Sequence, residues 1–154
     1  MIFLNPKQIK NLKKLIWGLL MIVSINACSK QKQAVETEAF QAMMKLQDEI
    51  RPQMSDINRL TLQLEKLETS VDSSDRQLLG EIDLAIRALE KADQGMMAWI
   101  NMNSGNKLEI LQSEKSHQEI MQYLEEEQQN LQKVNTLMLS SIEQAKKLVQ
   151  SMPE

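Results

Sequence analysis

The sequence predicts an all-α protein: an up-down-up antiparallel three-helix bundle that follows an N-terminal export signal. Apolar residues recur at steps of three and four along three long stretches, as the buried face of a helix requires. Two short polar segments separate these stretches. Aromatic residues make up only 3% of the 154 residues, and Met, Leu, Gln, Glu and Lys dominate. This composition is typical of helical bundles and poor in the residues that strands favour.

Residues 1–27 are predicted to be a signal peptide. A basic stretch, Lys7–Lys14, precedes the apolar run LIWGLLMIVSI at 15–25, and the small residue Ala27 follows. This order of basic, apolar and small residues is that of a secretory signal. As a helix, the apolar run would be about 17 Å long, well short of the ~30 Å hydrocarbon core. We therefore expect removal of this segment, with an uncleaved signal anchor as the alternative.

The lone cysteine indicates how the chain is attached. Ile25-Asn26-Ala27-Cys28 resembles the lipobox of bacterial lipoproteins, although Ile replaces the commoner Leu and Asn is unusual at the second position. The resemblance implies cleavage between Ala27 and Cys28 and acylation of Cys28 with fatty acids such as palmitate. A single acyl chain anchors only marginally, so stable attachment needs two or more chains.

By the sorting rules of Gram-negative lipoproteins, Ser29 in place of Asp implies the cell outer membrane. We expect the body to face the periplasm from the inner leaflet, with surface exposure left open.

We expect residues 28–35 to be a lipidated cysteine and polar tether, and residues 36–152 to be the bundle. The first helix is predicted from Glu36 to about Thr69, with a kink near Gln47–Arg51 because Pro52 removes a backbone hydrogen bond. Its apolar positions are Phe40, Met43, Ile50, Met54, Ile57, Leu60, Leu64 and Leu67.

The polar segment at 70–77 breaks the apolar pattern, and the second helix is predicted to begin within it, from about Asp75, and to end at Asn101. Ser74 and Gln77 have the spacing of a capping box. A clean heptad pattern follows: Leu78, Ile82, Ala85, Leu89, Ala92, Met96 and Trp99. Gly95 is unfavourable inside a helix, and we expect it to allow the close approach of a neighbouring helix.

The third helix is predicted to begin near the capping box of Ser116 and Glu119 and to end at about Gln150, after the polar segment NMNSGNK at 101–107. Its apolar pattern is Ile120, Leu124, Leu131, Val134, Met138, Ala145 and Leu148, with Glu127 and Ser141 as polar exceptions. In this topology, the second connection returns to the end that carries the lipid. The alternative is an extended, self-associating coiled coil.

Charge argues against nucleic-acid binding. All four basic residues of 1–27 belong to the signal, which leaves 14 basic and 21 acidic residues, a net charge of −7. An acidic body without a basic cluster lacks the groups that neutralise phosphates.

Methionine offers the main route to a cofactor. Thioethers are soft ligands suited to Cu(I), and Met43 and Met44 could face Met96 and Met97 if the first two helices are antiparallel. Core filling is the favoured role, because methionine is flexible and polarizable.

The single histidine, His117, could serve haem together with a methionine, but one histidine cannot build a two-histidine di-iron site. An exposed position in the first turn of the third helix is its favoured role. We therefore predict no cofactor and no metal site. The chain also shows no Gly-rich phosphate loop and no nucleophile elbow, so we do not expect an enzyme.

The body resembles a family of small Gram-negative lipoproteins sometimes labelled "viral A-type inclusion protein". The similar stretches are MKLQDEIRPQM (44–54), ALEKADQGMMAWI (88–100) and YLEEEQQNLQKVNTLMLSSIEQAKKL (123–148). Members often carry histidine at the position of Gln47 and methionine at that of Arg51, so this chain departs from them there, which argues against a metal.

The resemblance implies fold and location but no activity. The expected function is therefore a lipid-anchored periplasmic helical bundle with a non-catalytic binding or structural role in the cell envelope. An unidentified envelope protein is the expected partner, and a homo-oligomer is left open. The alternative function is a Met-lined Cu(I) or haem carrier.

Overall fold

The computed structural model describes residues 29–151, and these residues form helices joined by short turns, with no strand among them. This confirms the all-α prediction. Residues 29–50 are helical and are followed by α2 (Gln53–Ser70), α3 (Arg76–Asn103), α4 (Leu108–Glu114) and α5 (His117–Ser151). The predicted signal peptide, with Ala27 and Cys28, lies outside the described residues.

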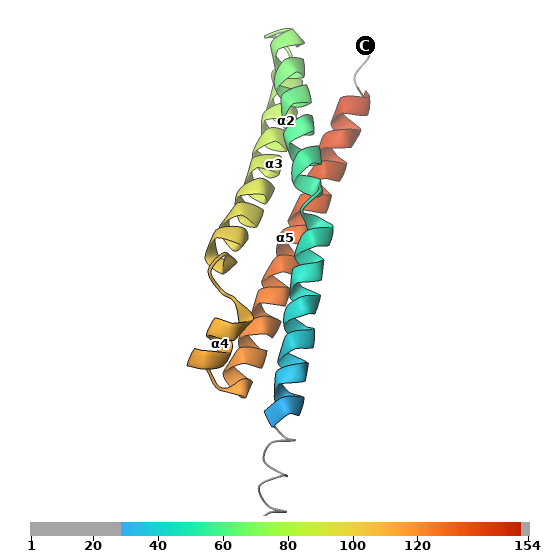
Figure 1. The fold of residues 1–154 in the computed structure, drawn as a ribbon. Coiled ribbons are helices and arrows are strands. Elements are labelled where there is room, and N and C mark those ends of the chain that lie inside the picture. Colours follow the sequence, from blue (N-terminus) through green and yellow to red (C-terminus); the bar gives the residue numbers. More distant parts are fainter. Residues whose placement is uncertain (1–28, 152–154) are drawn as a thin grey trace, which may run out of the picture.

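Three long helices pack against one another. Each of α2, α3 and α5 contacts the other two, and α4 contacts α5. In Figure 1 the chain ascends through residues 29–70, descends along α3 and ascends again along α5, while α4 lies beside the start of α5. The short helix α4 was not predicted: residues 108–114 were expected to belong to a connection or to the beginning of the third helix.

The first ascending stretch is broken at Pro52. Arg51 N–H still donates to the carbonyl of Gln47 at 2.9 Å, but Met54 N–H bonds to Arg51 O at 3.2 Å, three residues back. Residues 51–52 form a turn between two helices. Because proline has no N–H and crowds the preceding turn, the regular ladder stops there. The predicted position of the distortion is correct, although the helix is interrupted and not merely kinked.

The expected tether is wrong for the residues that the structure describes. Residues 29–35 were predicted to be irregular, but they are helical and continuous with the helix that runs to residue 50. The segment SKQKQAV is rich in Lys, Gln and Ala, which all have high helix propensity. Glu36, directly after it, is buried and bonded to other helices, which fixes the helix at this point.

The caps of two helices decide where they begin. In α3 the cap is Asp75, whose carboxylate accepts from Leu78 N–H at 3.1 Å. The predicted capping box at Ser74 is therefore wrong by one residue, and Ser74 N–H instead donates to Asp72 at 2.8 Å. The capping box of α5 is confirmed, because Ser116 N–H donates to the Glu119 carboxylate at 2.8 Å and Glu119 N–H donates to Ser116 Oγ at 3.4 Å.

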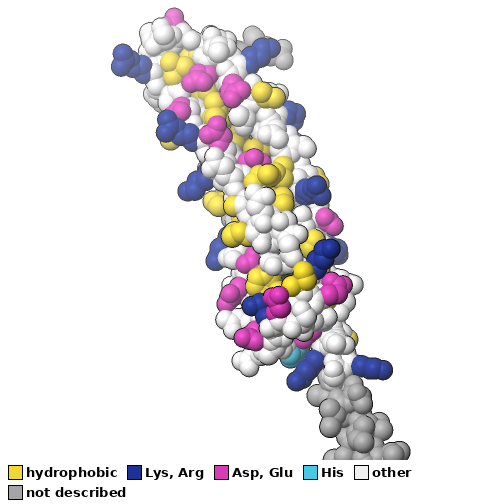
Figure 2. All heavy atoms as spheres, turned by 60° about the vertical axis from the view of Figure 1, so that its left-hand side comes forward, with side chains coloured by type: hydrophobic (Ala, Val, Ile, Leu, Met, Phe, Trp, Pro, Cys, Tyr) yellow, Lys and Arg dark blue, Asp and Glu magenta, His cyan; other side chains and the backbone are white. Residues whose placement is uncertain are grey.

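The core runs the length of the bundle. Most of the predicted heptad positions are buried, and they form one cluster in which Leu64, Leu89, Met96 and Leu131 are fully enclosed. Ser141, a polar exception in the pattern, is buried with its hydroxyl donating to Met138 O at 3.0 Å. Its hydrogen bond is thus made within its own helix. Figure 2 shows one face of the surface, where hydrophobic side chains follow the length of the bundle among charged side chains of both signs.

Gly95 does not mark the close helix approach that was expected. A Cβ placed there would meet Val134 Cγ2 at 3.7 Å, an ordinary contact, and one at Gly80 would meet nothing within 4 Å. We therefore expect Gly80→Ala and Gly95→Ala each to raise the free energy of unfolding by about 1 kcal/mol, because alanine loses less backbone entropy in a helix. Urea denaturation measures the change.

Gly105→Ala is the control for these variants, because Gly105 lies in the turn after α3 and gains no helix propensity. Destabilisation by Gly95→Ala would show that α3 and α5 approach more closely than described.

Candidate functional site

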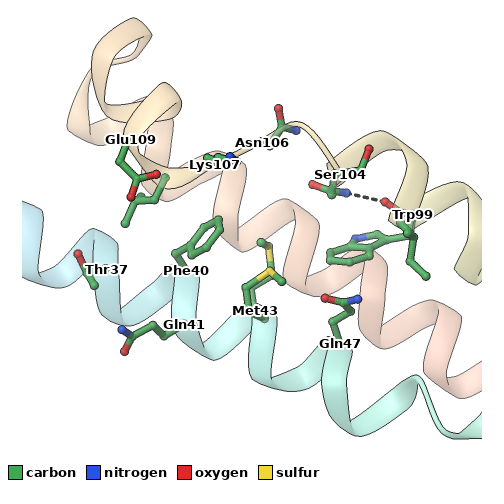
Figure 3. Close-up of a pocket in the computed structure, with 14 residues that line it drawn as sticks. Thr37, Phe40, Gln41, Met43, Gln47, Trp99, Ser104, Asn106, Lys107 and Glu109 are labelled. Atoms are coloured by element: carbon green, nitrogen blue, oxygen red, sulfur yellow. Dashed lines mark hydrogen bonds between the residues drawn. The ribbon is translucent and has the colours of Figure 1, made fainter.

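One concave feature is a pocket of about 520 Å³ at the end of the bundle near residue 29. Its walls come from residues 37–47, from the last turns of α3 and from the segment 104–109 that leads into α4 (Figure 3). α3 ends at Asn103, and four residues connect it to α4. This end of α3 therefore faces the first helix across a space that the connection covers. The volume lies within the range of small-molecule sites.

The lining is mostly apolar on the helices, with Thr37, Gln41 and Gln47 of the first helix as polar members. Phe40, Met43 and Met44 come from the first helix, Trp99 and Ile100 come from α3, and Leu108 opens α4. Polar groups line the pocket at the end of α3, along the connection and at the start of α4: Asn103, Ser104, Asn106, Lys107 and Glu109. The pocket therefore has a mostly apolar side along the helices and a mostly polar side along residues 103–109 (Figure 3).

Trp99 is the unusual member of this lining. Its side chain is only 3% exposed, and the indole Nε1–H has no hydrogen-bond partner among the described residues. Buried indole N–H groups normally find an acceptor, and an unsatisfied one costs about 1–3 kcal/mol. In Figure 3 the ring lies beside Met43, between the side chain of Gln47 and Ser104, with its nitrogen on the side of Ser104. Trp99 thus brings one buried donor without an acceptor to the wall of the pocket.

A hydrogen-bond network fixes the connection. Asn103 Nδ2 donates to Trp99 O at 3.0 Å and to Glu127 at 2.8 Å. Tyr123 on α5 donates to Asn103 Oδ1 at 2.5 Å and accepts from Asn106 Nδ2 at 2.7 Å. The polar exception Glu127 therefore holds the end of α3. These bonds make the polar side of the pocket a positioned structure and not a free loop.

Ionisation of Tyr123 should break this network. Burial raises the pKa of the Tyr123 phenol above its ordinary value of 10, with the hydrogen bond from Asn106 opposing the shift and the charge of Glu127 adding to it. A pKa raised in the folded state favours folding below the unfolded value, and this contribution is lost as pH rises through the folded value. We expect the free energy of unfolding to fall above pH 10, and to fall less in Tyr123→Phe.

Tyrosinate absorbance gives the pKa directly, because the chain has a single tyrosine. A midpoint at or below 10 in the folded protein would contradict the burial of the phenol.

A second polar cluster joins three helices at the same end. The carboxylate of Glu36, whose side chain is 5% exposed, accepts from Gln112 Nε2 of α4 at 2.8 Å. Its other oxygen lies 2.7 Å from His117 Nδ1 at the start of α5. Sequence reasoning treated His117 as an exposed first-turn residue and gave Glu36 no role. The cluster instead ties the first helix to α4 and α5.

The candidate ligands do not all line the pocket. Met43 and Met44 both line the pocket, whereas Met96 is enclosed in the core and Met97 is on the surface, and neither lines it. His117 does not line the pocket either, and its Nδ1 contacts the Glu36 carboxylate. Within residues 29–151, no three His, Cys, Asp or Glu side chains are grouped to hold a metal ion.

Sequence reasoning identified Trp99 only as a core position and missed the pocket. The pocket forms where residues 37–47 meet residues 99–109, which follow at least 50 positions later in the chain. The spacing of apolar residues does not predict this contact. The only local signal is that the tryptophan stands directly before the polar segment NMNSGNK.

None of the helices in residues 29–151 combines the length and apolar character that spanning a bilayer requires. No protein-family model matches the chain, and comparison with curated proteins and with solved structures found no similar protein.

Proposed function

We propose that this chain is a lipid-anchored helical-bundle protein of the periplasm with a non-catalytic binding role in the cell envelope. Fatty acids on Cys28 hold it to the outer membrane, and residues 36–152 act as an up-down-up three-helix bundle. The observation that carries the proposal is the resemblance of Ile25–Cys28 to a lipobox, directly before a helix that carries a wall of the pocket.

The position of the pocket supports this role. Phe40 is twelve residues beyond Cys28, which corresponds to about 18 Å along a helix. An anchor at Cys28 would therefore keep the pocket and α4 close to the bilayer and turn the 71–75 connection away from it. The partner of such a protein is a component of the envelope, because the acidic body does not suit nucleic acid. A homo-oligomer is compatible with the same anchor.

Acylation of Cys28 is the first test. Cells fed an alkyne-tagged palmitate should label the wild-type chain, and Cys28→Ala should abolish the label. Globomycin, which blocks the lipoprotein signal peptidase, should cause a larger acylated precursor to accumulate. Ser29→Ala is the matched control, because it keeps the thiol and should label normally. Equal labelling of the wild-type and Cys28→Ala chains would refute the anchor.

The location is tested separately. Ser29→Asp should move the acylated protein from the outer to the inner membrane fraction on a density gradient, because Asp at this position is the retention signal that Ser29 lacks. Unchanged fractionation of Ser29→Asp would refute the sorting assignment but leave the acylation intact.

A Cu(I) or haem carrier is the alternative function, and the specific observation in its favour is that Met43 and Met44 line the same pocket. Thioethers suit Cu(I). In this case, Cu(I) titration should give a one-to-one complex that Met43→Leu with Met44→Leu abolishes, while Met96→Leu with Met97→Leu leaves it unchanged. Haem titration of the wild-type chain and of His117→Ala tests the haem carrier. Absence of both complexes removes this alternative.

A further inference from the structure

We propose that the pocket beside Trp99 binds one single-chain acyl lipid, a fatty acid or a lysophospholipid, whose carbonyl or carboxyl oxygen accepts a hydrogen bond from Trp99 Nε1. The proposal names the ligand of the pocket described above. It rests on the proposed function only for the supply of lipid from a nearby bilayer, because the binding argument itself uses residues 37–109 alone.

The apolar side of the pocket suits a hydrocarbon chain. Phe40, Met43 and Met44 lie along a stretch of the first helix that contributes lining residues from Thr37 to Gln47, a length of about 15 Å. Ile100 and Leu108 face them from the other elements. Methionine and phenylalanine side chains adapt to flexible apolar ligands.

The buried indole N–H defines the head of the ligand. Trp99 is 3% exposed and its Nε1 has no acceptor among the described residues. A hydrocarbon alone would leave this donor unsatisfied, at the cost of a missing hydrogen bond. An acyl lipid supplies a carbonyl oxygen at one end of an apolar chain. It therefore matches both features of the pocket, which a plain alkane does not.

The polar rim accommodates the headgroup without selecting its charge. Lys107 and Glu109 both line the rim, and neither belongs to an ion pair within residues 29–151. Their opposite charges offset each other. The class of ligand is therefore set by the single chain and the acceptor oxygen, and either a carboxylate or a phosphocholine head fits.

Quenching of Trp99 fluorescence by bromine tests the proposal. The full chain with Trp17→Phe, which leaves Trp99 as the only tryptophan, is reconstituted into phosphatidylcholine vesicles. Dibromostearic acid and a lysophosphatidylcholine with a dibromostearoyl chain are the probes, and we expect at least one to quench Trp99 saturably. Vesicles of dibrominated two-chain phosphatidylcholine control for simple nearness to the bilayer and should not quench.

Two methionines give matched variants. Met44 lines the pocket and is 36% exposed, whereas Met97 is 43% exposed and lies outside it. Met44→Glu places a charge against the hydrocarbon chain of the lipid, which is costly when the charge is unpaired. The probe concentration that gives half-maximal quenching should therefore rise by at least about tenfold. Met97→Glu should bind as the parent does. Dibromo-octadecane, which lacks the acceptor, should bind roughly fivefold or more weakly, equivalent to about 1 kcal/mol.

Several results would overturn the proposal. Absence of saturable quenching, or equal quenching by the two-chain lipid, would show that the pocket takes no single-chain lipid. Equal loss in Met44→Glu and Met97→Glu would place the probe elsewhere, and equal binding of dibromo-octadecane would remove the role of Trp99. Quenching seen only with Cys28→Ser would mean that the chain's own acyl group occupies the pocket. Palmitate labelling at Cys28 is measured independently, so failure of the anchor is distinguished from failure of the pocket.

Discussion

Leu89→Ala should lower the free energy of unfolding by about 3 kcal/mol, within the range found for leucine deletions in well-packed cores. Leu89 lies midway along α3, its side chain is fully enclosed, and α3 contacts both α2 and α5. The long helices that surround it cannot collapse readily into the space left behind. The loss therefore includes both the transfer of the leucine side chain and the cavity.

Leu84→Ala is the matched control on the same helix, because the Leu84 side chain is 68% exposed. This variant should change stability by less than about 0.5 kcal/mol. Chemical denaturation followed by circular dichroism measures both variants. Similar losses for the two leucines would mean that the outer face of α3 is covered in solution, as in the self-associating coiled coil, and sedimentation of Leu84→Ala would then show a change in oligomeric state.

His117→Ala should cost about 2 kcal/mol, because it leaves a buried carboxylate without one of its two side-chain partners. The Glu36 side chain is 5% exposed and that of His117 is 33% exposed, so water can replace part of the lost contact, which holds the loss below that of a fully buried pair. Gln112 remains bonded to the other oxygen of Glu36. Thermal unfolding measures the effect.

Gln118→Ala is the control for the loss of one polar side chain in the first turn of α5, because Gln118 is exposed. Glu36→Gln combined with His117→Ala completes a double-mutant cycle, and the two losses should not add. Hydrogen exchange within α4 should accelerate in His117→Ala, since the cluster that holds α4 is weakened. If His117→Ala matched Gln118→Ala in stability and exchange, Glu36 would not link the three helices.

The spacing of residues three or four positions apart in the sequence predicted the helices and the faces that they bury. The heptad spacing of α3 predicted Ile82, Leu89, Met96 and Trp99 as core residues, and all are buried. The spacing of Ser116 and Glu119 predicted the cap of α5. These features depend on residues three or four positions apart, so the chain displays them without reference to any other element.

Errors occurred where two local signals competed or were weak. Ser74 and Asp75 are both good caps, and only the structure shows that Asp75 holds the helix. Residues 29–35 have no apolar periodicity, yet their helix propensity is high, and they continue into a helix fixed by its packing. The separate helix α4 is only seven residues long, too short to give a periodic signal.

Helical periodicity in the sequence was sufficient for the all-α class and for most of the core, since an amphipathic face is encoded within a few turns of chain. The acylation site at Cys28 stays a prediction from sequence resemblance alone. Only the tertiary structure showed the Trp99 pocket and the bonding of Glu36 to His117, 81 residues apart. Such contacts depend on how helices are aligned along one another, and that alignment results from the packing of the whole core.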